Sequence, residues 1–356
     1  MKVGILTSGG DCSGLNAVMR GIALNLYGQD PATEIIGFRN GYAGLINDDW
    51  SVMSRKDFEG ILCEGGTILG STRTPYKQMT IPEEDGVSRL AKMTENYRKN
   101  RLECLFALGG AGTHKNAALL CAEGCNVIAL PKTIDNDVYG TDYTFGFQTA
   151  VGVAAEALQR IRTTAQSHTR TILVEIMGNK AGWLTLYAGI AGAADIILIP
   201  EIPFNLDKVV ATVKNGYASG KRSMILAVAE GAVLDTEAPY KRKERVFIRT
   251  QLGEKTVIPH LAEIIGESTG LETRATSLGY IQRGGEPCAF DKVLCTRLGS
   301  YAAQLCREKK YGVAVSLSGN RITFNALADI AGKYKLVDPD SEIVRGAEGI
   351  GISFGR

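Results

Sequence analysis

The sequence predicts an α/β protein in which doubly wound parallel sheets carry helices on both faces. Short apolar runs rich in Val, Ile and Leu alternate along the chain with longer segments of helical period. These runs are apolar almost without interruption, which is typical of strands that are buried on both sides. The chain has 356 residues, which as a prior corresponds to two domains or one large domain.

Each predicted element follows from its own residue pattern. The predicted strands are residues 2–7, 34–38, 102–108, 126–130, 171–176, 194–199, 224–229, 273–278 and 313–316. Apolar residues at helical spacing predict helices between them, at 15–27, 112–122, 148–164, 206–215, 257–267 and 292–308. Pro200 closes the strand at 194–199, and with Pro203 it favours an extended turn. Turn residues or charges cluster at 28–33, 82–85 and 235–245, which predicts solvated connections.

The composition excludes several classes of protein. A share of 45% hydrophobic and 22% charged residues is that of a globular protein and excludes disorder. The 40 Lys and Arg residues nearly balance the 38 Asp and Glu residues, which gives a net charge of only +2. Neither nucleic acid nor a membrane is therefore an expected partner. No apolar run approaches the roughly 18 residues that a membrane helix needs, and the N-terminus lacks a signal-peptide pattern. The eight cysteines show no CxxC spacing, so free thiols and a cytoplasmic location are expected.

Glycine-rich turns follow the first and third predicted strands. They read SGGDCSGLN (residues 8–16) and LGGAGTHKN (residues 108–116), and each leads into a predicted helix. In such turns, backbone N–H groups at a helix N-terminus can cradle a phosphate. Neither turn fits the dinucleotide-binding or P-loop fingerprint, so each one alone is also compatible with an ordinary tight turn.

The segment PKTIDND (residues 131–137) follows the fourth predicted strand. It places Asp135 and Asp137 beside Lys132 and Thr133, which could supply a general base and a contact for Mg²⁺. The alternative is a solvated turn in which the carboxylates only accept hydrogen bonds from the backbone.

Three arginines lie near predicted strand boundaries: Arg170, Arg274 and Arg283. Arginine binds phosphate through two parallel hydrogen bonds, so the three together favour an anionic substrate. His168 and His260 have no partners at metal-ligand spacing, and we expect structural roles for them.

Together, these segments resemble the 6-phosphofructokinase family over almost the entire chain. The matching segments are TSGGDCSGLNAVMRG, GGTILGSTR, GGAGTHKNA, PKTIDNDV, TFGFQTAV, SHTR, AVAEG and ETRATSLGYIQRGG. Members of this family transfer a phosphoryl group from ATP, or from pyrophosphate in a sub-group, to the 1-hydroxyl of fructose 6-phosphate. The resemblance therefore implies a glycolytic kinase that uses Mg²⁺ and forms fructose 1,6-bisphosphate.

The resemblance also implies a role for each matching residue. Asp135 would be the general base, with Thr133 and Asp137 flanking the sugar and the metal-bound water. Arg73 would stabilise charge on the transferring phosphoryl group. The donor would contact Gly10, Arg73, Thr74, Gly110, Ala111, Gly112 and Thr113. The sugar phosphate would contact Thr133, Ile134, Asp135, Arg170, Met177, Gly178, Asn179, Glu230, Arg274, Tyr280, Ile281, Gln282 and Arg283.

The chain departs from the family pattern at three of these positions. Ala111 stands where the family's GGDG loop carries the metal-binding aspartate, and a methyl group cannot coordinate Mg²⁺. Asp137 or Asp11 would then hold the ion through water, and roughly 10²–10³-fold in rate is at stake. A natural subtype, an engineered substitution and a non-catalytic paralogue remain open. Asn179 replaces the arginine of an MGR motif, and Tyr280 replaces a histidine that many members carry.

Two positions that track the phosphoryl donor in this family disagree here. Gly112 is the ATP-type residue, because an aspartate there would repel the α-phosphate. Lys132 is the pyrophosphate-type residue, since its ammonium can neutralise a second small anion. Room for the nucleotide is the stricter requirement, so we favour ATP. The alternatives are a pyrophosphate-dependent phosphotransferase and a catalytically silent protein that binds the sugar phosphate.

The resemblance implies two domains that face each other across a cleft. Residues 1–146 and 282–332 would form the donor domain, and residues 147–281 and 333–356 the sugar-phosphate domain. Arg170 and Arg274 match arginines that family members supply from a neighbouring subunit, so a homodimer or homotetramer with shared active sites is expected. Arg20 matches an effector-binding position of shorter bacterial relatives, but Leu24 replaces a second arginine there. Effector control of that type is therefore not expected.

Overall fold

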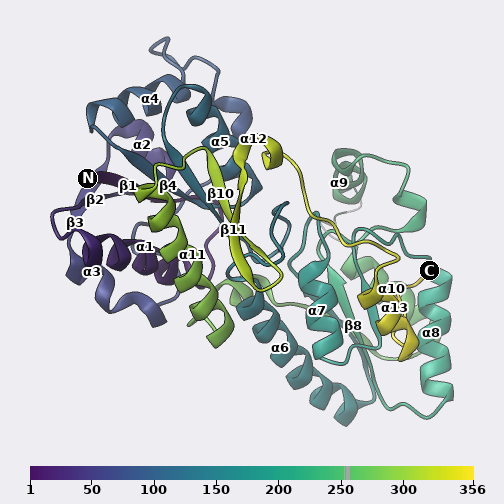
Figure 1. The fold of residues 1–356 in the computed structure, drawn as a ribbon. Helices are drawn as coiled ribbons and strands as arrows, with labels where there is room; N and C mark the ends of the chain where they lie inside the picture. Colours follow the sequence, from purple (N-terminus) through teal and green to yellow (C-terminus); the bar gives the residue numbers. More distant parts are fainter. Residues whose placement is uncertain (252, 254–256) are drawn as a thin grey trace. The chain divides into compact units, whose positions relative to one another are not determined.

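The computed structural model describes residues 1–251, 253 and 257–356, which fold into two compact units (Figure 1). Unit 1 comprises Met1–Thr149 and Arg283–Lys335, and unit 2 comprises Ala150–Gln282 and Leu336–Arg356. Each unit is built on its own sheet, and strands alternate with helices along most of the chain. The predicted α/β fold class is confirmed.

A seven-stranded sheet in the order β11-β10-β5-β4-β1-β2-β3 forms the centre of unit 1. Its strands are β1 (Lys2–Thr7), β2 (Glu34–Phe38), β3 (Trp50–Met53), β4 (Cys104–Gly109), β5 (Val127–Pro131), β10 (Val313–Ser318) and β11 (Arg321–Ala326). From β10 to β2, neighbouring strands run parallel, as their apolar runs predict. The edge strands β3 and β11 are antiparallel to their neighbours and were not predicted, so this sheet is mixed.

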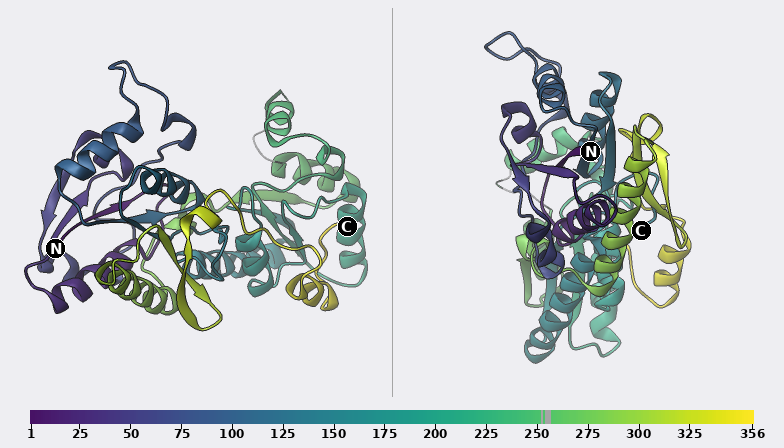
Figure 2. Two further views of the ribbon diagram at one scale, coloured as in Figure 1. Left: turned by 45° about the horizontal axis from the view of Figure 1, so that its top comes forward. Right: turned by 60° about the vertical axis from the view of Figure 1, so that its left-hand side comes forward.

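Helices cover both faces of this sheet. On one face, α1 (Leu15–Gln29) and α11 (Ala289–Arg307) lie side by side (Figures 1 and 2). They can approach closely because Gly299 of α11 has no Cβ. A Cβ there would collide with the backbone of α1. The short α3 (Arg55–Glu59) packs on α1. The core on the other face joins the strands to α2 (Tyr42–Asn47), α4 (Arg89–Lys99), α5 (Ala111–Ala122) and α12 (Leu327–Ile330).

Unit 2 contains a four-stranded parallel sheet in the order β7-β8-β6-β9. The strands are β6 (Thr171–Ile176), β7 (Ile196–Leu198), β8 (Met224–Ala229) and β9 (Thr273–Ser277). One core joins the sheet to α8 (Leu206–Ala218) and α10 (Ile258–Thr269). On β7, Ile197 points to α7 (Trp183–Ala191), where it meets Gly189. Two further helices are α6 (Phe147–His168), which begins in unit 1, and α13 (Glu342–Gly349).

Several predicted boundaries change in the structure. The predicted connection at residues 235–245 is wrong in part, because it contains the 3₁₀ turn η3 (Asp235–Glu237) and the start of α9 (Arg242–Gln251). The predicted connection at residues 28–33 begins inside α1, which continues to Gln29. The strand predicted at residues 194–199 shortens to three residues. Asp195 precedes it as a buried carboxylate, which accepts a hydrogen bond from the Ile225 N–H at 2.8 Å.

All eight cysteines are unpaired thiols, and five of them are buried. Burial raises the pKa of Cys12 to about 12, with the charge of Lys132 acting in the opposite direction, so this thiol stays protonated. Within the described residues, the helices are too short or too polar to cross a membrane.

Candidate active site

Three turns of unit 1 with predicted site residues follow β1, β4 and β5, which are neighbours in the sheet. Parallel strands end at the same edge of a sheet, and ligands of α/β proteins bind at that edge. The Ser8 N–H donates to the Leu108 carbonyl at 2.9 Å, and the Lys132 N–H donates to the Gly109 carbonyl at 3.0 Å. The structure therefore brings the two glycine-rich turns and the PKTIDND turn together.

A strap formed by residues 65–74 lies against the first glycine-rich turn. The Gly9 N–H donates to the Thr72 carbonyl at 2.9 Å, and the Ser71 hydroxyl donates to the Gly9 carbonyl at 2.7 Å. These two bonds fix the strap to the turn from both directions. Arg73 and Thr74 are the last two residues of this strap, directly after Thr72. They therefore belong to the same group of loops as Gly10.

The start of α5 is a sharp turn that only glycine permits. A Cβ on Gly109 would collide with the side chain of Thr113. The first-turn N–H groups of a helix lack intrahelical partners, and Gly110 at the N-cap offers no side chain to receive them. A Cβ on Gly112 would meet nothing within 4 Å. The turn therefore has uncapped N–H groups and free space, the properties that a phosphate site at a helix N-terminus needs.

Lys132 is buried, and its ammonium donates to the carbonyl oxygen of Gly10. Burial lowers the pKa of this ammonium. The positive charge of Arg283 lowers the pKa further, and the carboxylate of Asp135 raises it. Lys132 thus connects the turn after β5 to the turn after β1.

Arg283 lies in unit 1 and contacts the turn that carries Gly10. Its Nη1 donates to the carbonyl of Asp11 at 3.0 Å, and a Cβ on Gly10 would lie 2.8 Å from that nitrogen. The resemblance assigned Arg283 to the sugar phosphate. Its guanidinium packs on the first glycine-rich turn, and Gly10 leaves the space that it needs.

The turn that carries Asp135 and Asp137 is held by Asn136 between them. Asn136 is buried in the left-handed region at φ 51°, which asparagine tolerates better than most residues. Its side chain accepts from the Thr144 N–H at 3.0 Å, while Thr133 Oγ1 accepts from the Asp135 N–H at 3.1 Å. Sequence reasoning missed Asn136, although an asparagine between two aspartates is a recognisable turn signal.

The described residues offer few ligands for Mg²⁺ at the start of α5. Ala111 is the first residue of α5, and its methyl group offers no oxygen ligand. Within the described part of the chain, there is no cluster of three His, Cys, Asp or Glu side chains that could hold a metal ion. Asp137 is the predicted ligand that remains on this turn, and its backbone carbonyl already accepts from the Lys335 N–H at 3.0 Å.

Unit 2 brings together a second group of predicted residues after β6 and β8. The Glu230 N–H donates to the Ile176 carbonyl at 2.9 Å. Behind it, a Cβ on Gly231 would collide with the backbone of Asn179, so only glycine allows the two loops to meet. The buried side chain of Gln282 accepts from the Met177 N–H at 3.1 Å. Met177, Gly178, Asn179, Glu230 and Gln282 therefore share one end of the sheet.

Other predicted sugar-phosphate residues of unit 2 lie outside this group. Tyr280 and Ile281, on the 3₁₀ turn η4 (Gly279–Arg283), are 82% and 69% exposed. Arg170 and Arg274 both pair with Glu272, at 2.8 Å and 2.6 Å. Arg170 precedes β6, whereas Met177 follows it, and six strand residues span about 20 Å.

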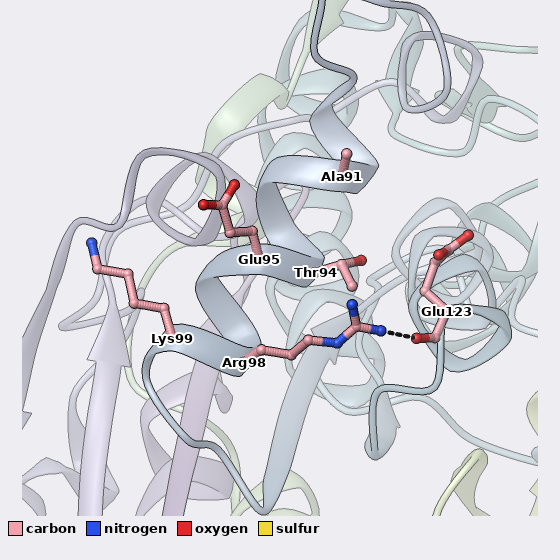
Figure 3. A pocket seen from close by; sticks show the side chains of 6 residues that line it. All are labelled: Ala91, Thr94, Glu95, Arg98, Lys99 and Glu123. Atoms are coloured by element: carbon pink, nitrogen blue, oxygen red, sulfur yellow. Dashed lines mark hydrogen bonds between the residues drawn. The ribbon is translucent and has the colours of Figure 1, made fainter.

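A depression of about 580 Å³ on unit 1 lies away from these turns, between α4 and the end of α5 (Figure 3). It is lined by Ala91, Thr94, Glu95, Arg98, Lys99 and Glu123. The guanidinium of Arg98 crosses it and donates to the Glu123 carbonyl at 2.9 Å. No predicted site residue lines this depression.

The fold and the turns define an α/β protein whose glycine-rich turns meet at the ends of neighbouring parallel strands. The phosphofructokinase family model matches residues 2–306, and the chain belongs to the phosphofructokinase family. It is 46% identical to an ATP-dependent 6-phosphofructokinase of Spirochaeta thermophila, over 99% of this chain and 97% of that protein. It is 44% identical to a pyrophosphate–fructose 6-phosphate 1-phosphotransferase of Amycolatopsis methanolica, over 96% and 97%.

Solved structures agree with this family assignment. The phosphofructokinase of Saccharomyces cerevisiae superposes with a TM-score of 0.78 at 29% identity, over 93% of this chain. This chain spans 45% of that longer yeast chain.

Proposed function

We propose that the chain is a 6-phosphofructokinase that transfers the γ-phosphoryl group of ATP to the 1-hydroxyl of fructose 6-phosphate. The single observation that carries the proposal is the meeting, at one sheet edge, of the donor turns after β1 and β4 with the Asp135 turn after β5. Relatives that cover nearly the whole chain bear ATP-dependent names, which supports ATP as the donor. The product would be fructose 1,6-bisphosphate, formed in the cytoplasm as a step of glycolysis.

Each unit has its own task in this proposal. Unit 1 would bind the donor through the uncapped start of α5 and through Arg73, which neutralises charge on the transferring group. Asp135 would accept the proton of the attacking hydroxyl, because a carboxylate on a fixed turn is suited to general-base work. Unit 2 would hold the sugar phosphate through the loops of Met177–Asn179 and Glu230. Phosphoryl transfer needs positioning and charge neutralisation more than covalent chemistry, so this division suffices.

Three observations favour ATP over pyrophosphate. The space beside Gly112 is open, and the ammonium of Lys132 is already engaged by the Gly10 carbonyl. Lys115 on α5 lies over the ring of Tyr76 at 5.6 Å and over that of Tyr334 at 5.9 Å. Aromatic rings beside a cation form a surface on which a nucleobase can stack, and pyrophosphate has no group to use it.

The subunit arrangement is a second part of the proposal. Arg274 lies on the edge strand β9, in which four of the five residues are exposed, and Arg170 lies beside this strand. They are a strand length away from Met177 in the same chain. Both features support a role for these arginines in the active site of a neighbouring subunit, and hence a homodimer or homotetramer.

One observation favours a silent protein as the second candidate. Ala111 removes the carboxylate that the family places at the start of α5, so any Mg²⁺ that accompanies ATP has few protein ligands here. The retention of Asp135, Thr133 and Arg73 favours an active enzyme, because a silent protein has no chemical need for them.

The test is turnover of fructose 6-phosphate by the purified chain with Mg²⁺, with ATP and pyrophosphate compared side by side. Formation of fructose 1,6-bisphosphate with ATP, and its loss in Asp135→Asn, is the expected result. Preference for pyrophosphate would select the phosphotransferase alternative. Binding of the sugar phosphate by calorimetry without turnover, for both donors, would favour the silent protein.

A further inference from the structure

Arg249 on α9 is the only arginine that is buried among the side chains that the structure describes. A guanidinium is costly to bury unless its hydrogen bonds are satisfied. Arg249 donates from Nε to Glu237 Oε1 at 2.8 Å and from Nη2 to Glu237 Oε2. This is a two-point ion pair, which fixes the orientation of both side chains.

The same guanidinium reaches the loop that follows β8. Its Nη2 also donates to the carbonyl oxygen of Ala232 at 3.0 Å. The Ala232 N–H in turn donates to the Ala229 carbonyl at 2.9 Å, so residues 229–232 form a tight turn. Glu230, a predicted sugar-phosphate contact, is inside this turn and two residues from the oxygen that Arg249 holds.

The turn presses against the other sugar-phosphate loop. Gly231 packs so closely on Asn179 that a Cβ would collide with the Asn179 carbonyl. The Gly231 N–H donates to the Gly178 carbonyl at 3.3 Å. Two loops with predicted substrate contacts therefore touch through Gly231, and Arg249 supports one of them from behind.

The ion pair favours the charged form of Glu237. Burial raises the pKa of Glu237, but the hydrogen bonds and the charge of Arg249 lower it more, so that the pKa of this carboxyl lies below its usual value. Arg245 on the same helix differs in its contacts, because its guanidinium donates to the Tyr240 carbonyl at 2.9 Å and acts on Glu237 through its charge.

From these contacts we propose that Arg249 is a positioning residue for the sugar phosphate. Paired with Glu237, it holds the 229–232 turn against Gly178 and Asn179 and thereby sets the orientation of Glu230. The inference rests on the proposed function, because it takes this end of the unit 2 sheet as the sugar-phosphate site. If the inference is correct, breaking the Arg249–Glu237 ion pair lowers the affinity for the sugar phosphate but not the affinity for the donor.

The experiment compares Arg249→Met and Arg249→Lys with the unchanged enzyme. Lysine keeps the charge but lacks the two-point geometry. Both variants should raise the KM for fructose 6-phosphate by about tenfold, the size expected for loosening one charge-assisted contact. The KM for ATP and kcat should stay within about twofold. Arg245→Met is the matched control on the same helix, and it should leave all three constants unchanged.

A purely structural role of Arg249 would give a different result. In that case, the melting temperature would fall while the KM for sugar stayed as it was, or both KM values would rise together, and either outcome would overturn the proposal. If Arg249→Met fails to fold, Arg249→Lys and Glu237→Gln carry the same comparison. Calorimetric binding of fructose 6-phosphate distinguishes a failure of the proposed function from a failure of the inference about Arg249. No binding and no turnover by the unchanged chain contradict the proposed function, whereas equal binding by the unchanged chain and the variant contradicts the inference alone.

Discussion

The ammonium of Lys132 donates to the carbonyl oxygen of Gly10, and so joins two turns that the sheet order separates. Lys132 follows β5 and Gly10 follows β1, while β4 lies between these strands. The bond therefore passes over the strand whose own turn leads to Ala111. A buried lysine in this position organises the donor turns as one unit.

Lys132→Met should weaken donor binding in general. Loss of one charge-assisted hydrogen bond frees the first glycine-rich turn, which should raise the KM for ATP and for pyrophosphate by about tenfold each. Steady-state kinetics with both donors measure this directly. A fall in pyrophosphate turnover alone would instead mean that the ammonium serves the second anion.

Ala111→Asp should raise kcat by about 10²–10³-fold, because it restores an oxygen ligand at the start of α5. An aspartate in the first turn of a helix is also favourable toward the helix dipole, so the variant should fold normally. The measurement is kcat as a function of Mg²⁺ concentration, with Ala111→Asn as the control that adds an amide without a charge. An unchanged kcat would contradict a limiting role for the missing carboxylate.

His114 should make the protein less stable in mild acid. Burial lowers the pKa of this imidazole to about 4, helped by the charge of Lys132 and opposed by a hydrogen bond to the Leu130 carbonyl. Between its unfolded pKa of 6.5 and the folded value, the unfolded chain binds more protons. Stability is therefore lost as the pH falls through that window.

The contribution of His114 to the loss of stability can be measured by urea unfolding at pH 7 and pH 5. The free energy of unfolding of the unchanged chain should fall by about 2 kcal/mol more than that of His114→Gln. The exposed His168→Gln provides the control and should behave as the unchanged chain does. Equal losses in all three proteins would exclude His114 as the source.

Mixed subunits should reveal whether Arg274 acts across a subunit interface. Asp135→Asn and Arg274→Ala should each be strongly impaired alone. A hybrid dimer of the two would contain one site with both native residues, so an equal mixture should recover about a quarter of the native activity. Activity is measured after dissociation and reassembly. No recovery, in hybrids verified by mass, would contradict shared active sites.

Much of the fold follows from the sequence because buried parallel strands have a simple signature. The bounds of β1, β2, β6 and β8 agree with the predicted runs, each an apolar segment between turn residues. The edge strands β3 and β11 lack this signature because they are partly exposed and carry polar residues. Helix α9 was missed because most of its side chains are polar, and its apolar Phe247 is exposed.

The candidate site was predictable where it depends on local turns and not where it depends on distant partners. Glycines and aspartates after a strand indicate a site, because ligands bind at the ends of parallel strands. The partners of Lys132, Arg283 and Arg249 lie 122, 272 and 17 residues away in the chain. The local sequence pattern does not identify such contacts, because residue type alone does not distinguish a buried arginine from an exposed one.

The place of β10 in the first sheet has a consequence for synthesis of the protein. β5 needs β10 as its neighbour, yet β10 is encoded more than 180 residues later. At ribosomal speeds, the free edge of β5 waits roughly 10–40 s for its partner. During that interval, the nascent chain exposes an apolar strand edge of the kind that pairs with other chains. Yield in a cell should therefore depend on chaperones that shield the N-terminal half until residue 318 has left the ribosome.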